Sequence, residues 1–160
     1  MTNMCIMAAN RLIEKTNTYN NSVDYCNKIL MTCKRLQKLL FFSEVIYMQK
    51  HDGQPMFSDE FYAWPSGPVI PSVYDKFMQY QDGKMLPVLG YHTPLDQEME
   101  DVLEEVFKKT KDIETEKLVE MSHIPRGPWA QVYDPDDSGH FQIVTKKSMY
   151  EFYKNKDVLC

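Results

Sequence analysis

Residues 36–48 are apolar around almost the whole circumference of a helix. Nine of these positions hold Leu, Phe, Val, Ile, Tyr or Met, and they do not gather on a single stripe. Such a helix cannot face water on any side, so it must lie in the middle of a domain with other elements packed around it. Thr32 is suited to cap its start, and Gly53 is suited to end it in a left-handed conformation. The segment therefore predicts a central helix that runs through Lys50.

Shorter helices are predicted around this one from apolar spacing and capping residues. They are expected at residues 5–15, 71–78, 93–109 and 115–122 and after Thr145, and residues 23–30 are expected to be helical behind a Ser22 cap, alone or joined to the central helix. Thr93 is the expected N-cap of the 93–109 helix, with Pro94 at its first position, and Thr115 is the expected cap of the next helix. The Asn-rich residues 17–21 predict a loop, because their side chains compete for backbone hydrogen bonds.

Two stretches resemble strands instead. Residues 56–64 alternate loosely, and the apolar residues 141–144 are candidates to pair with them. Pro65, Gly67 and Pro68 make a central strand improbable and predict a shaped turn that leads to a helix starting at Pro71. The expected fold class is α+β and mainly α: a single helical domain over residues 1–160 with a small antiparallel β-sheet.

Charge and apolar content limit the classes of function. The chain has 160 residues and a formal net charge of -5, which argues against a broad phosphate-binding face and makes a nucleic-acid partner an unfavoured expectation. Its longest uninterrupted aliphatic and aromatic run, residues 39–42, is far too short to span a membrane, and no export signal follows Met1. We expect a cytoplasmic protein with no membrane partner, whose cysteines (Cys5, Cys26, Cys33 and Cys160) are free thiols.

The sequence contains no recognisable catalytic or metal-binding pattern. It lacks a phosphate-cradling glycine loop and the common hydrolase and zinc-protease motifs, and its histidines (His51, His92, His123 and His140) are far apart. We therefore expect no enzyme activity, no cofactor and no metal site. An enzyme centred on His123 or a cysteine would require the fold to join His123 to Cys33, Glu44 or Asp75 in a deep pocket.

Two aromatic regions are candidates for a binding surface. His123 precedes a rigid bend that contains Arg126 and ends at Trp129. Its ring is either clamped against the indole or, as the simpler alternative, lies at a helix end where it bonds backbone carbonyls. Arg126 is positioned to stack on that indole or to reach a carboxylate on a partner. Trp64 and Trp129 are typical binding residues if exposed and ordinary core residues if buried, and the sequence leaves both readings open.

Three motifs resemble one known family. They are the run Leu-Gln-Lys-Leu-Leu-Phe-Phe at residues 36–42, the run Ala-Trp-Pro-Ser-Gly-Pro-Val-Ile-Pro-Ser-Val-Tyr at residues 63–74, and His123 followed by Pro128 and Trp129. Together they are similar to the Panacea domain family, which includes SocA-like antitoxins and phage-associated GepA-type proteins. Residues 7–15 are similar to the opening helix of that family, whereas residues 16–30 are longer than its usual link, so they are expected to be an insertion or an extra helix in a single Panacea-like domain.

The resemblance implies a mainly helical domain that neutralises a protein toxin by direct binding, or in one branch delivers the toxin to a protease. The expected partner is a protein toxin encoded next to this chain. The candidate partner-binding residues are the distinctive members of the second and third motifs: Trp64, Gly67, Pro68, Tyr74, His123, Arg126 and Trp129.

A DNA-binding transcriptional regulator of a phage or mobile element is the alternative hypothesis. It rests on the helical content and on the cationic cluster Lys28, Lys34, Arg35 and Lys38. The net charge of -5 counts against it.

Overall fold

The computed structural model describes residues 3–80, 85–91, 94–138 and 140–159. The helices in these ranges are α1 (Met4–Asn20), α2 (Cys33–Lys50), α3 (Pro71–Phe77), α4 (Gln97–Thr110), α5 (Thr115–Ser122), α6 (Pro128–Val132) and α7 (Lys146–Tyr153), with a 3-10 turn at Tyr25–Asn27. The strands are β1 (Phe61–Trp64), β2 (Gly67–Val69) and β3 (Ile143–Val144). The predicted class, α+β and mainly α with a small antiparallel sheet, is confirmed. None of the described helices is long and apolar enough to cross a membrane.

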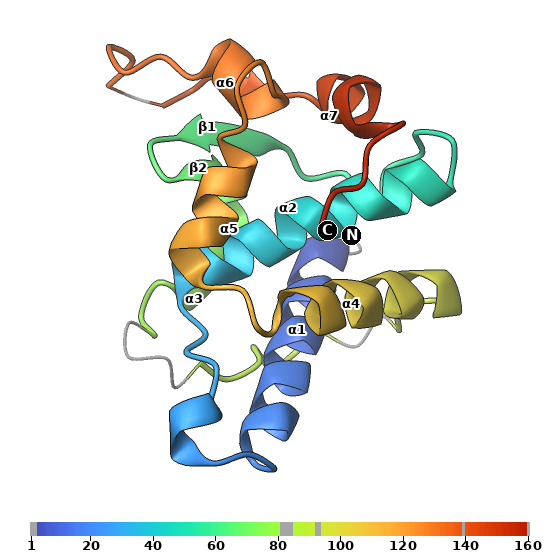
Figure 1. Ribbon diagram of the computed structural model, residues 1–160, viewed down its shortest axis with the longest axis vertical. Coiled ribbons are helices and arrows are strands. Elements are labelled where there is room, and N and C mark those ends of the chain that lie inside the picture. The colour runs from blue at the N-terminus through green and yellow to red at the C-terminus, as the bar shows by residue number, and fades with distance from the viewer. Residues whose placement is uncertain (1–2, 81–84, 92–93, 139, 160) are drawn as a thin grey trace.

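Helix α2 lies at the centre of the molecule, as predicted (Figure 1). Every residue from Arg35 to Met48 is buried, and the helix contacts α1, α3, α4, α5, α7 and β2. In the view of Figure 1, α1 and α4 lie below α2, while the sheet, α6 and α7 lie above it. The Phe41 ring makes edge-to-face contacts with Phe61 of β1 and Tyr153 of α7. One helix therefore supplies the core for both groups of elements.

Two of the predicted helix caps are confirmed. The hydroxyls of Thr32 and Thr145 accept hydrogen bonds from the backbone N–H groups of Arg35 and Ser148, each at 3.1 Å. Each bond satisfies one of the N–H groups that the first turn of a helix leaves without a partner. At the other end of α2, Gly53 has a φ of 87°, as expected for a glycine after a helix.

Two other predicted caps are corrected. Helix α4 begins at Gln97 rather than at Pro94, because Asp96 is extended and its carboxylate accepts the Met99 N–H at 2.9 Å. The expected cap Thr93 lies outside the described residues. Thr115 is the first residue of α5 and not its N-cap, and its hydroxyl accepts a hydrogen bond from Arg35 at 3.3 Å instead.

The loop predicted at residues 17–21 is wrong over most of its length, because α1 continues through Asn20. Its asparagine side chains bind other parts of the chain instead of their own backbone. Asn17 donates to the Met85 carbonyl at 3.1 Å, and Asn20 both donates to and accepts from the backbone of Ile29 at 2.8 Å. With these distant partners, the side chains no longer compete with the helix.

The α1–α2 segment (residues 21–31) is irregular, so the helical stretch predicted at residues 23–30 is also wrong. The Ser22 hydroxyl donates back to the Tyr19 carbonyl at 2.8 Å and caps no helix. Tyr25 is 89% exposed and Leu30 is 60% exposed. A helix here would have no buried face to stabilise it, and short helices are not stable without one.

The sheet has the strand order β2-β1-β3 and is antiparallel throughout. The pairing predicted for residues 141–144 is confirmed, with Val144 opposite Phe61 and Ile143 opposite Tyr62. The turn predicted over residues 64–71 is in part a hairpin, because residues 67–69 form β2. Pro68 is tolerated there because β2 is an edge strand, where a missing N–H breaks no sheet hydrogen bond.

Buried polar side chains of α2 hold the segments around it. The Gln37 side chain accepts the Ile70 N–H at 2.8 Å and donates to the Ile70 carbonyl at 3.1 Å. Glu44 accepts the Met56 N–H at 3.0 Å and pairs with Lys146 at 3.3 Å. The entry to β1, the exit from β2 and the start of α7 are therefore all fixed from α2.

We predict that Gln37→Leu lowers the free energy of unfolding by about 2–4 kcal/mol, because it leaves the buried N–H and C=O of Ile70 without partners. Urea denaturation of the purified variant measures this loss. Gln79→Leu, at an exposed position, is the matched control and is expected to change stability by less than about 0.5 kcal/mol. Equal losses in the two variants would contradict the role given to Gln37.

Candidate partner-binding surface

The fold brings the two predicted aromatic regions together. The indole N–H of Trp129 in α6 donates to the backbone carbonyl of Trp64 at the end of β1, at 2.8 Å. Trp64 in turn makes an edge-to-face contact with Tyr74 of α3, with 5.1 Å between ring centroids. Regions 65 residues apart in the chain thus form one surface. We call Trp64, Tyr74, His123 and Trp129 the aromatic surface.

The rings around Trp129 form a stack. His123, the residue that ends α5, lies 3.7 Å from the indole centroid at an angle of 8°, and Tyr133 lies 4.5 Å away at 15°. Of the two alternatives for His123, the structure shows the contact with Trp129. Stacked rings with a hydrogen-bonded indole lose little further conformational freedom when a partner binds.

The exposure of the two tryptophans falls between the alternatives that the sequence left open. Trp64, Tyr74, His123 and Trp129 are all half-buried. Each ring therefore packs against the domain on one side and presents part of its surface to solvent. Tyr and Trp residues in this situation are typical of protein interfaces.

Arg126 does not stack on Trp129. It is exposed, has a φ of 68°, and its side chain makes no cation–π contact or ion pair within the described part of the chain. Its backbone carbonyl accepts a hydrogen bond from the Gln131 side chain at 2.8 Å. The guanidinium is therefore available to a partner beside the aromatic surface.

Gly67 and Pro68 are buried and shape the hairpin from within. Gly67 has a φ of 113°, and a Cβ at this position would lie 2.6 Å from Ser122 Oγ and 2.9 Å from Lys38 Cε. The Lys38 ammonium donates to the Pro68 carbonyl at 2.7 Å. These contacts join β2 to α2 and to the end of α5, and so hold the aromatic surface in place.

The electrostatics beneath this surface are unusual. Burial lowers the pKa of Lys38 to about 7, with a smaller contribution from the positive charge of Lys34. Burial, together with the Lys38 charge, also lowers the pKa of His123. Nε2 of His123 is buried and has no hydrogen-bond partner among the described residues. His123 is therefore neutral at physiological pH and behaves as an aromatic ring in the stack.

Two of the cysteines, Cys33 and Cys5, are poor candidates for the nucleophile of an unrecognised enzyme. Burial raises the pKa of Cys33 to about 11, and burial, with a contribution from Asp59, raises that of Cys5 to about 12. Both thiols therefore stay protonated and weakly nucleophilic at neutral pH. Across the described ranges, no cluster of His, Cys, Asp and Glu could hold a metal ion. Cys160 and His92 lie outside the described residues.

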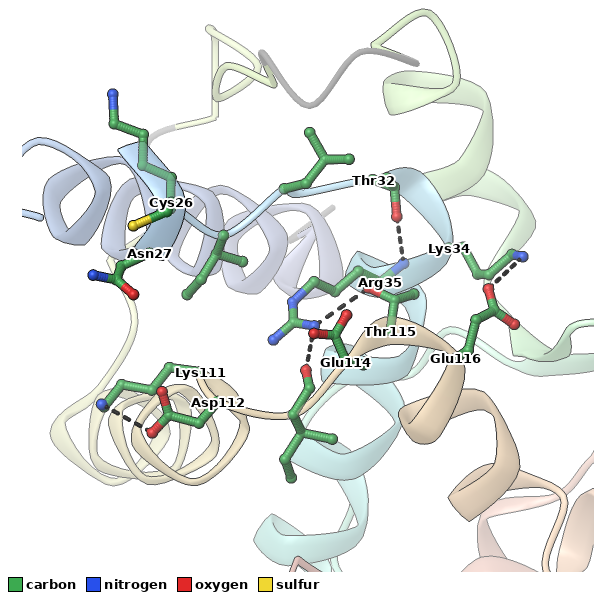
Figure 2. Close-up of a pocket in the computed structure, with 14 residues that line it drawn as sticks. Cys26, Asn27, Thr32, Lys34, Arg35, Lys111, Asp112, Glu114, Thr115 and Glu116 are labelled. Carbon is green, nitrogen blue, oxygen red and sulfur yellow. Dashed lines mark hydrogen bonds and ion pairs between the residues drawn. The ribbon is translucent and has the colours of Figure 1, made fainter. Parts of the chain in front are cut away.

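A polar pocket of about 600 Å³ opens between the α1–α2 segment and the link from α4 to α5 (Figure 2). Figure 2 shows Arg35 in the middle of it, with the ion pairs Lys34–Glu116 and Lys111–Asp112 on either side. Arg35 itself donates to the carbonyls of Thr110 and Ile113, both at 2.8 Å. Two of the lysines that line this pocket are therefore paired with carboxylates of the chain, and the Arg35 guanidinium is held by backbone carbonyls.

The cationic cluster proposed for DNA binding does not form a surface. Arg35 and Lys38 are buried, and Lys34 is paired with Glu116 at 3.1 Å. Lys28 lies 5.9 Å from the ring centroid of Tyr25. A phosphate-binding face needs several free cations on one side of the molecule, and this cluster does not supply them.

Sequence reasoning missed the residues that support the surface from below. Ser122 and Tyr133 were not selected, and Gln37 and Lys38 were given no supporting role, although both belong to the first family motif and Lys38 also to the proposed DNA-binding cluster. The available clue was the pair Gln37–Lys38 inside an otherwise apolar helix. Polar side chains on a helix buried on all sides must find hydrogen-bond partners, so they mark where neighbouring backbone is held.

A family model described as "Antitoxin SocA-like, Panacea domain" matches residues 36–130 of this chain. The chain belongs to this family. The match runs from the end of the first turn of α2 to the residue after Trp129, so it contains the whole aromatic surface of the Panacea domain and the hairpin beneath it. Helix α1 and the α1–α2 segment precede the matched region.

One curated relative of this Panacea-domain chain is Antitoxin SocA of Caulobacter vibrioides (strain NA1000 / CB15N). The two are 31% identical over 105 residues, which cover 59% of this chain. The matched part spans about half of the relative, 55% of its length. No solved structure matches this chain.

We predict that Gly67→Ala destabilises the protein by about 2 kcal/mol more than Gly90→Ala. Both glycines have positive φ, 113° and 95°, so both variants carry backbone strain of about 1–3 kcal/mol. Only the Cβ at Gly67 meets Ser122 and Lys38, since nothing lies within 4 Å of a Cβ at Gly90. Thermal denaturation of both variants measures the difference. Equal losses of stability would show that the Gly67 site can accommodate a Cβ without a clash against Ser122 and Lys38.

We also predict that Lys38 makes stability rise with pH above neutrality. The pKa of Lys38 falls from 10.5 to about 7 on folding, so the unfolded chain binds more protons than the folded chain between these values. Stability then increases with pH through this window, by at most about 1.4 kcal/mol per pH unit, and Lys38 adds no slope below it. Urea unfolding between pH 6.5 and 9.5 should show a flatter profile for Lys38→Met than for the wild type. Lys147→Met, at an exposed lysine, should keep the wild-type slope.

Proposed function

We propose that this chain is an antitoxin-like, non-enzymatic binding module that neutralises a protein toxin by direct contact. The observation that carries the proposal is the joining of two motifs of the family in one ordered aromatic surface. The family match supports an antitoxin role, and the half-exposed rings support a protein partner.

The aromatic surface suits protein binding for a physical reason. Its rings are fixed by stacking, by the 2.8 Å bond from Trp129 to Trp64 and by the buried Lys38 below the hairpin. A surface ordered before binding loses less side-chain entropy on association. The exposed guanidinium of Arg126 at its border can pair with a carboxylate on the partner.

The toxin is expected to be the product of a neighbouring reading frame. The antitoxin acts either by holding the toxin or as an adaptor that delivers it to a protease. The two modes differ in their effect on the toxin's lifetime: holding leaves its half-life unchanged or longer, and delivery shortens it. Pulse-chase measurement of the toxin in co-expressing cells distinguishes them.

Co-expression tests the proposal. Each neighbouring reading frame is expressed alone and together with this chain, and growth and co-purification are measured. We expect one neighbour to be toxic alone, harmless with this chain, and recovered with it on affinity purification. Neighbours that are harmless when expressed alone and never co-purify would overturn the proposal.

The surface itself is tested with Arg126→Glu. Because this side chain is exposed and makes no ion pair or cation–π contact with the described residues, we expect an unchanged melting temperature and at least tenfold weaker toxin binding. Lys147→Glu introduces the same charge change at another exposed site and should bind like the wild type. Isothermal titration calorimetry compares the two, and equal affinities would remove Arg126 from the binding surface.

A further inference from the structure

A groove of about 660 Å³ borders the aromatic surface on the face of β1 turned away from α2. Along β1, Phe61 and Ala63 are buried, whereas Tyr62 and Trp64 are half-buried and line the groove. Its walls are residues 58–60 before β1, residues 70–72 at the start of α3, and residues 140–141 before β3. Trp64 belongs both to the groove and to the aromatic surface, so the two are continuous.

Large apolar side chains are exposed to solvent at or next to this groove. Phe141, on one wall, is 74% exposed. Ile143, the cross-strand neighbour of Tyr62, is 38% exposed. Exposed apolar groups gathered next to a concave surface are typical of an interaction site.

The groove is also acidic, and its acids are not neutralised by the chain. Asp59 and Glu60 line it, and neither forms an ion pair with any described residue. Within the described ranges, Asp59 has only uncharged partners, a long hydrogen bond from the Ser72 hydroxyl at 3.4 Å and a hydrogen bond with the Cys5 thiol. Lys146 exerts an electrostatic effect from nearby, but it is held by Glu44 at 3.3 Å and by the Phe57 carbonyl at 3.1 Å.

The acids of α4 show the opposite arrangement. Glu100, Glu104 and Glu105 pair with Arg11, Lys15 and Lys50 of α1 and α2, and Glu98 lies 2.7 Å from Nε2 of His51. These four carboxylates of α4 therefore have partners within the fold. Those of the groove remain available to an external cation.

The wall before β3 carries a further unsatisfied group. His140 lines the groove with a φ of 51°, a conformation that non-glycine residues adopt at a cost. Its Nδ1 is buried and has no hydrogen-bond partner among the described residues. Strain and an unpartnered ring nitrogen in a groove wall are features that a bound partner can relieve.

We infer that this groove binds an extended segment of the toxin that carries an apolar side chain next to a lysine or arginine. The apolar side chain packs between Trp64 and Phe141, and the cation pairs with Asp59 and Glu60. This inference rests on the proposed antitoxin function and names the chemistry of its partner. A nucleic acid is disfavoured because the groove carboxylates repel phosphate, and a second copy of this chain is one outcome of the test below.

The test uses a double variant of the groove and a matched double variant elsewhere. Glu60→Lys with Phe141→Ser reverses one exposed charge and removes one exposed ring at the groove. Asp24→Lys with Tyr25→Ser makes the same chemical changes in the α1–α2 segment, where Tyr25 is 89% exposed. Figure 1 places that segment at the opposite end of the molecule from the sheet. Both variants should melt like the wild type.

With the toxic neighbour in hand, we expect the groove variant to bind at least tenfold more weakly and to lose protection of the cell, while the matched variant behaves as the wild type. Binding by the wild type should weaken as salt rises, and the groove variant should lose much of this dependence. Wild-type affinity in the groove variant would overturn the inference and leave the antitoxin function intact. Loss of a wild-type dimer in the groove variant, with toxin binding unchanged, would assign the groove to self-association and also overturn it.

If no neighbour is toxic, the proposed function itself is overturned. A second experiment then tests whether the groove binds a segment of the stated chemistry. The probes are short synthetic peptides with a central Trp, Leu or Ser between two lysines, titrated while backbone amide signals of the protein are followed by NMR. We expect saturable shifts at Tyr62 and Trp64 with the Trp peptide. An affinity at least fivefold weaker for the Ser peptide, and for the groove variant, would support binding in the groove. Equal weak shifts for all peptides, or shifts outside the groove, would overturn it.

Discussion

Helix α2 is buried on every side, so each polar side chain that it carries must find a hydrogen-bond partner inside the protein. Lys38 binds the Pro68 carbonyl of β2, and Gln37 binds the backbone of Ile70 just after it. Arg35 binds the last carbonyl of α4, and Glu44 binds the Met56 amide and Lys146. An edge strand with unpaired backbone groups invites association with other chains. Here the side chains of α2 satisfy that edge, so the hairpin is fixed in position and closed on that side.

The same constraint gives physical meaning to two of the family motifs. The runs at residues 36–42 and 63–74 are the two halves of one hydrogen-bonded unit, since Gln37 and Lys38 bind Ile70 and Pro68. Gly67 fits there because side chains of α2 and α5 occupy the space of a Cβ. Much of this recognisable sequence therefore builds a support, and the half-exposed rings of Trp64, Tyr74 and Trp129 are what the support presents to solvent.

Features that depend on neighbouring residues in the chain were predicted from the sequence, whereas features that depend on contacts between distant residues were mostly missed. The central helix and the Thr32 and Thr145 caps follow from local spacing and were predicted correctly. The pairing of β1 with β3 is long-range, but each strand has a local pattern, and the pairing was predicted from these two patterns. The continuation of α1 through Asn20 was not, because its asparagines bind residues that only the fold brings near. The contact of His123 with Trp129 was one of two alternatives suggested by their closeness in sequence, whereas the bond from Trp129 to Trp64 spans 65 residues and has no local signal.

The reach of the α2 side chains also bears on the order in which the chain assembles. Its helical hydrogen bonds are local and can form early, but Gln37 must wait for a residue 33 positions away and Arg35 for carbonyls 75 and 78 positions away. Until those segments dock, burying the apolar surface of α2 would also bury a charge or an amide that has no hydrogen-bond partner. Collapse around this helix before those segments are in place is therefore unfavourable. The hairpin and the α4–α5 link must dock before the core can close, rather than after it has formed.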